Sequence, residues 1–118
     1  KIIKNEGFIL PHTDSKSKFL SLMLYFPKYK ENDLEFHKEN QLGTILYDSK
    51  LKNYSSNHLS GDQLNIFLKE SKVIQKLPFK PFHLYGFMRS SNSWHALDKI
   101  NINKDYERFS VNINYIVN

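Results

Sequence analysis

The strict alternation of polar and apolar residues from Arg108 to Tyr115 is the feature that most restricts how this chain can fold. A period of two places successive side chains on opposite faces of a β-strand. Arg108, Ser110, Asn112 and Asn114 therefore share one face, and the apolar residues between them share the other. In an ordinary β-sandwich the polar face of such a strand lies in water.

Other short apolar runs stop at Pro, Gly or a polar stretch: Gly7–Pro11, Phe19–Phe26, Thr44–Tyr47, Val73–Phe79, Phe82–Met88 and Trp94–Leu97. Phe19–Phe26 is nearly all apolar, which predicts a strand covered on both faces. Gly43 permits a turn, and Gly86 indicates a close approach inside a strand. About seven strands at a spacing of roughly 8–12 residues predict a mainly all-β domain, an antiparallel sandwich or barrel such as a jelly roll.

One short helix interrupts this pattern. Ser60 is placed to cap it, and Leu64, Phe67 and Leu68 follow at helical spacing. Lys28–Asn40 predicts a solvated connection. Residues 48–58 predict a loop with a weak strand near Tyr54, and residues 98–107 predict a polar connection.

The amino-acid composition excludes several classes of functional site. The 118 residues fit one domain, and the absence of Cys excludes disulfide scaffolds, thiolate metal sites and a cysteine nucleophile. Lys and Arg total 17 against 12 Asp and Glu, a net charge of +5, but only Arg89 and Arg108 are Arg, which argues against a nucleic-acid reader. No apolar run approaches the roughly 20 residues of a membrane span, so we expect no membrane partner and a cytoplasmic location.

Two clusters contain candidate metal ligands. In an extended segment His12 and Asp14 point to the same side, although both residues also suit the turn after Pro11. His95 follows the only Trp of the chain, where a core His bonded to a backbone carbonyl is the alternative. Two His and one carboxylate form the ligand set of a non-haem Fe(II) centre.

A third cluster suits an organic acid. The guanidinium fork of Arg108 can bind a carboxylate through two hydrogen bonds, and the Ser110 hydroxyl can donate to the same oxygen pair. This arrangement would anchor the distal end of a dicarboxylic acid.

The ordered set of blocks resembles the Fe(II)/2-oxoglutarate-dependent dioxygenases, in particular the prolyl 4-hydroxylase-like catalytic core. The blocks are Gly7–Leu24, Leu42–Thr44, Leu77–Pro81, Asn92–His95 and Arg108–Tyr115. The resemblance implies a double-stranded β-helix, or jelly roll. It also implies that His12, Asp14 and His95 hold Fe(II), and that Arg108, assisted by Ser110, binds the C5 carboxylate of 2-oxoglutarate.

The implied reaction uses O2 to hydroxylate a small-molecule or peptidyl substrate, with succinate and CO2 as co-products. A non-catalytic jelly-roll or cupin-like ligand-binding module is the alternative. Lys99 and Lys104 stay open as carboxylate anchors, since some relatives use Lys there. His37, His58 and His83 are expected at the surface.

Only eleven residues precede His12, where the family has further helices and strands. We therefore expect residues 1–118 to be a single catalytic core that lacks N-terminal elements. Sheet surface exposed in this way would favour pairing of two copies. Substrate selectivity is expected in loops such as 28–41 and 48–60.

Overall fold

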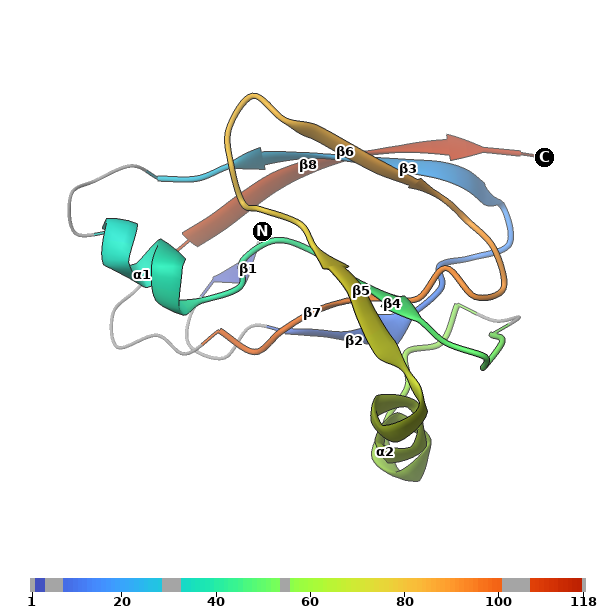
Figure 1. Ribbon diagram of the computed structural model, residues 1–118. Coiled ribbons are helices and arrows are strands. Elements are labelled where there is room, and N and C mark those ends of the chain that lie inside the picture. Colours follow the sequence, from blue (N-terminus) through green and yellow to red (C-terminus); the bar gives the residue numbers. More distant parts are fainter. Residues whose placement is uncertain (1, 4–7, 29–32, 54–55, 101–106, 118) are drawn as a thin grey trace.

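The computed structural model describes residues 2–3, 8–28, 33–53, 56–100 and 107–117, which form two layers of β-sheet (Figure 1). The larger sheet has the order β1-β8-β3-β6, formed by Ile2–Ile3, Glu107–Ile116, Lys18–Phe26 and Leu84–Met88. The smaller sheet has the order β2-β7-β4-β5, formed by Ile9–His12, His95–Leu97, Ile45–Asp48 and Lys72–Lys76. All pairings are antiparallel within these residues. The predicted mainly β architecture is confirmed, and β1 is a strand that the sequence pattern missed.

The central pair of the larger sheet is β3 and β8. Their register places Ser21 opposite Asn114 and Met23 opposite Asn112. Both strands alternate with a period of two, so their inward side chains meet on one face of the sheet.

Two helices occur in the described residues, where the sequence pattern predicts one. The expected helix is α2 (Gly61–Glu70), and Ser60 occupies its N-cap position, although its side chain makes no capping hydrogen bond. The unexpected helix is α1 (Asp33–Glu39), inside the stretch interpreted as a solvated connection. Its Phe36 is buried in the core, so tertiary packing stabilises a helix that its polar sequence does not indicate.

Apolar side chains fill one end of the space between the sheets. The main cluster consists of Met23, Tyr25, Phe36, Leu42, Leu77, Phe79 and Ile100. Ile100 falls in the stretch predicted as a polar connection. Residues 101–106 of that connection, like Tyr54, lie outside the described residues. A second group forms beneath α2, where the ring of Phe67 lies 4.8 Å from that of Trp94. The other end of the interior is left for polar side chains.

Two glycines mark close contacts between strands. A Cβ at Gly86 would lie 2.6 Å from Leu22 Cδ2, which confirms the predicted close approach. A Cβ at Gly43 would lie 1.8 Å from the carbonyl oxygen of Leu77. Any larger residue at position 43 would collide with the backbone of the segment after β5. The prediction that Gly43 permits a turn did not include this close contact.

The two faces of β3 differ, so the prediction that both are covered is wrong. Ser21, Met23 and Tyr25 on one face are buried. On the other face Phe26 is exposed, and Leu20, Leu22 and Leu24 are only partly buried. The reason is that neither α1 nor α2 covers the outer face of the larger sheet (Figure 1). In the described part of the chain, no helix is long and apolar enough to cross a membrane.

Candidate metal centre

The three predicted metal ligands come together at the junction of β2 and β7. The pairing of these strands sets His12 directly opposite His95. One potential ligand atom from each of His12, Asp14 and His95 lies within 4.8 Å of the others, so the cluster can hold a metal ion.

Asp14 reaches the two imidazoles by a route that the sequence argument did not anticipate. β2 ends at His12, and Asp14 has a left-handed backbone with φ of 66°. Asp tolerates this conformation better than most residues. Asp14 Oδ1 lies 3.2 Å from His12 Nε2, and Oδ2 lies 3.6 Å from His95 Nε2. A turn, and not an extended strand, therefore completes the cluster.

Backbone carbonyls orient both imidazoles. His12 Nδ1 lies 3.0 Å from the carbonyl oxygen of Leu10, and His95 Nδ1 lies 2.9 Å from that of Ser93. A carbonyl only accepts, so Nδ1 is the donor in each ring and Nε2 faces Asp14. Carbonyl support of this kind is common behind metal-binding His.

His12 lies next to Oδ1 of Asp14 and His95 lies next to Oδ2, so one ion could be held among the three side chains. A donor set of two imidazole nitrogens and one carboxylate oxygen suits a divalent transition metal.

Two residues that the sequence analysis did not single out also contact Asp14. Lys18 Nζ lies 3.3 Å from Oδ1, and Ser21 Oγ donates to Oδ2 over 3.4 Å. Burial favours a higher pKa for Asp14. Hydrogen bonds from His12 and His95, with the charges of His95 and Lys18, outweigh burial and hold that pKa well below its usual range. The inward position of Ser21 on β3 was the available signal for its role.

A cavity of about 260 Å³ joins the metal cluster to the polar face of β8. Arg108, Ser110, Asn112 and Asn114 line it together with the three candidate ligands. The alternating strand thus turns its polar side inward. The cavity runs from the buried Arg108 to Asn112 and Asn114, which are exposed.

Arg108 is a buried residue of this cavity's lining. Its Nη1 donates to Ser110 Oγ over 3.3 Å, and its Nε donates to the carbonyl of Leu42. The guanidinium carbon lies 5.1 Å from the ring centroids of both Tyr25 and Phe79. Its position is therefore fixed from several sides.

Of the two alternative Lys anchors, the structure describes only Lys99. Lys99 lines a different, mainly apolar cavity, and Lys104 lies outside the described residues.

His58 is exposed, as expected, but it also belongs to the surroundings of the site. Its ring stacks on that of His12 with a centroid distance of 4.1 Å and an interplanar angle of 21°. Burial lowers the pKa of His58, and the neighbouring His12 and His95 lower it further against the opposing effect of Asp14. No local pattern indicated this contact, because a segment about 45 residues from His12 supplies it.

Comparison of the chain with protein-family models, with curated proteins and with solved structures gives no match.

Proposed function

We propose that this protein is an Fe(II)- and 2-oxoglutarate-dependent dioxygenase that hydroxylates an organic substrate. The reaction converts substrate R–H, 2-oxoglutarate and O2 into R–OH, succinate and CO2. The supporting observation is that a single cavity is lined by a cluster of two His and one Asp and by a buried Arg. An oxo acid that chelates a metal at one end needs a cation at the other, and Arg108 would supply it.

Each residue has a separate task. His12, Asp14 and His95 would hold Fe(II), which supplies O2 activation when bound. Arg108 and Ser110 would bind the distal carboxylate and so set which end of the acid reaches the metal. The tyrosine and phenylalanine rings around Arg108 limit the access of water to this ion pair.

The strand order supports a double-stranded β-helix. Within the described residues, eight strands form two four-stranded sheets, and successive strands alternate between the sheets at nearly every step. Jelly rolls are likewise folds of eight strands in two sheets, which supports this part of the proposal.

The test is anaerobic titration of the protein with Fe(II) and 2-oxoglutarate. We expect a weak metal-to-ligand charge-transfer band in the visible region, followed by succinate formation when O2 is admitted. His12→Ala should weaken both signals, because it removes one of the three metal-binding groups.

Val111→Thr is the matched control, because Val111 lies on the outer face of β8 and is about half exposed. It should leave both signals intact. Failure of the wild type to bind iron contradicts the proposal. Iron binding without succinate favours the alternative, a non-catalytic ligand-binding module.

A further inference from the structure

The cavity of about 260 Å³ beside the metal cluster (the inner cavity) contains a second cation besides Arg108. This cation is Lys18, the first residue of β3. Its Nζ lies 3.3 Å from Asp14 Oδ1, and its side chain is 29% exposed. Because Lys18 contacts a candidate metal ligand and also lines the cavity, it can contact a molecule that lies next to the metal.

A β-bulge directs Lys18 into the inner cavity. Strict alternation along β3 would place Lys18 on the outer face of the sheet, together with Leu20 and Leu22. The register between β3 and β8 is irregular at this point, because the two steps from Lys18 to Leu20 match one step along β8. Bulges of this kind change the direction of a side chain and are common beside active sites. The bulge thus brings a cation to the metal cluster, whereas a regular strand would direct it away.

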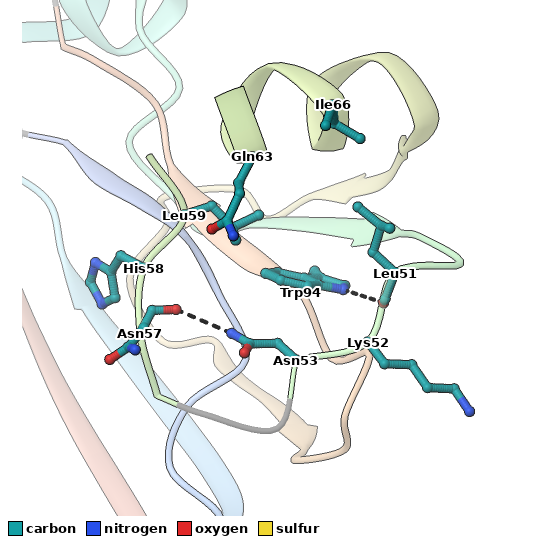
Figure 2. Close-up of a pocket in the computed structure, with 9 residues that line it drawn as sticks. All are labelled: Leu51, Lys52, Asn53, Asn57, His58, Leu59, Gln63, Ile66 and Trp94. Atoms are coloured by element: carbon teal, nitrogen blue, oxygen red, sulfur yellow. Dashed lines mark hydrogen bonds between the residues drawn. The ribbon is translucent and has the colours of Figure 1, made fainter. Parts of the chain in front are cut away.

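A neighbouring cavity, shown in Figure 2, does not reach the metal cluster. It is lined by α2, the loop before α2 and Trp94, and none of the three candidate metal ligands contributes to its lining. His58 lies between this cavity and the cluster, since it lines the cavity and its ring stacks on that of His12 at 4.1 Å. The inner cavity is therefore the space for a molecule that reacts at the metal.

The lining of the inner cavity has a net positive charge. Arg108 and Lys18 are cationic, and Asp14 is the one carboxylate among the described lining residues. Fe(II) and 2-oxoglutarate, when bound, carry equal and opposite charges and leave this balance unchanged. A further ligand with one negative charge would neutralise the site, and charges that are partly removed from water are stabilised by such pairing. A cationic ligand would instead increase the excess of positive charge.

The size and the polar lining of the inner cavity favour a small molecule. Its volume of about 260 Å³ is below the roughly 300–1,000 Å³ of sites for drug-sized ligands, and 2-oxoglutarate would fill the part next to Arg108. Asn112 and Asn114 are exposed residues of the same lining, and their amides can hydrogen-bond to a second ligand. Ser21 Oγ lies 3.1 Å from Asn114 Oδ1 and 3.4 Å from Asp14 Oδ2, so these amides begin close to the metal cluster.

We propose that Lys18 binds the carboxylate of the molecule that is hydroxylated, and that this molecule is a small organic acid. The inference rests on the dioxygenase function proposed above and names the class of substrate for the same cavity. A metal ion bound to Asp14 would replace Lys18 as the partner of that carboxylate. The Lys18 ammonium, which has three donors on a flexible stem, can then turn to the substrate. Lys18 lies in β3, outside the loops in which the sequence predicts selectivity.

The test compares three probes with the same carbon chain: butanoate, butanamide and 1-aminobutane. The protein is loaded with Mn(II) and 2-oxoglutarate, so that the oxo acid occupies the site at Arg108 and the paramagnetic Mn(II) accelerates the NMR relaxation of nearby protons. Relaxation of the probe protons therefore reports binding next to the metal. The dissociation constant of butanoate should be about tenfold below that of butanamide, because a charge-assisted hydrogen bond is stronger than a neutral one. 1-Aminobutane should bind most weakly.

Variants of two lysines separate substrate binding from support of Asp14. Lys18→Gln should reduce butanoate binding to the level of butanamide, whereas binding of butanamide and Mn(II) should change by less than about fivefold, the upper range for a partly exposed ion pair. Lys18→Arg keeps the positive charge and should restore most of the butanoate binding. Lys16→Gln is the matched control, because Lys16 is exposed and does not line the inner cavity, and it should bind all three probes like the wild type.

Several results would overturn the proposal. Equal binding of the three probes would exclude a site for an anion next to the metal. Equal loss of butanoate and butanamide binding in Lys18→Gln would show that Lys18 only supports Asp14, and the same loss in Lys16→Gln would show a general effect of surface charge. Binding of Mn(II) and 2-oxoglutarate without relaxation of butanoate would exclude this substrate class and leave the dioxygenase function intact. Failure to bind either Fe(II) or Mn(II) would instead contradict the dioxygenase function itself.

Discussion

The two faces of β8 have opposite chemistry and opposite surroundings. Its inward face carries Arg108 and Ser110, which line the cavity beside the metal cluster. Its outward face carries Val111, Ile113 and Tyr115, which are about half exposed to solvent. A strand in an ordinary sandwich turns its apolar face to the core and its polar face to water.

This reversal shows that the space between the sheets serves two purposes. One end is an apolar core that fixes the strands, and the other is a cavity with many polar residues in its lining. Arg108 lies at the boundary, because it lines the cavity while Tyr25 and Phe79 of the core lie against its guanidinium. Substitutions on the inward face should therefore change ligand binding, whereas substitutions on the outward face should change self-association of the protein.

The largest effect is expected from Asp14→Ala in the inner cavity. We expect Fe(II) affinity to fall by more than about 100-fold, because even residues that only support metal ligands cost about 10- to 100-fold. Isothermal titration under anaerobic conditions measures this directly. An Fe(II) affinity within threefold of the wild type would show that the ion binds elsewhere.

Substitutions of Arg108 test whether binding of the organic acid and binding of the metal are separate functions of the inner cavity. Arg108→Met should raise the dissociation constant of 2-oxoglutarate by about 10- to 100-fold, because a charge-assisted pair is lost, while Fe(II) binding persists. Arg108→Lys retains the charge without the fork and should fall between this variant and the wild type. Thermal unfolding of each variant checks that loss of the Arg108 contacts has not unfolded the chain. Equal loss of iron and 2-oxoglutarate binding would contradict separate roles for the two ends.

Much of this arrangement could be predicted from local patterns. The alternation in β8 was sufficient to place Arg108 and Ser110 on one face, and the short apolar runs located most strands. The site residues His12, Asp14 and His95 were found because their chemical types are distinctive. Whether they hold iron and whether Arg108 binds an oxo acid stay predictions.

The features that local sequence patterns did not predict depend on contacts between segments far apart in the sequence. Asp14 meets both imidazoles through a left-handed turn, and a strand rule cannot foresee that conformation. The stacking of His58 on His12 depends on where the loop before α2 lies. Helix α1 was missed because burial of Phe36 outweighs the polar residues around it.

The pH dependence of the free energy of unfolding should show how strongly the surroundings of Asp14 favour its ionised form. Its pKa is lowered in the folded state, so the folded protein binds fewer protons than the unfolded chain as the pH falls. The resulting stabilisation is complete above the unfolded pKa of about 3.9 and declines as the pH drops below it. Urea unfolding of metal-free protein between pH 7 and pH 3 should give a shallower decline for Asp14→Asn than for the wild type. Parallel curves would show that Asp14 does not control acid stability.

The smallest effect on the single chain is expected on the outer face. Val111→Thr combined with Ile113→Thr keeps β-branched side chains and changes only partly exposed groups. Each substitution should change the free energy of unfolding by no more than about 0.5 kcal/mol, with Fe(II) binding unchanged. Exposed apolar patches of this kind promote association, so the double variant should self-associate less than the wild type in sedimentation equilibrium. A loss of several kcal/mol in urea unfolding would instead show that this face is packed within one chain, and the contrast between the two faces of β8 would be wrong.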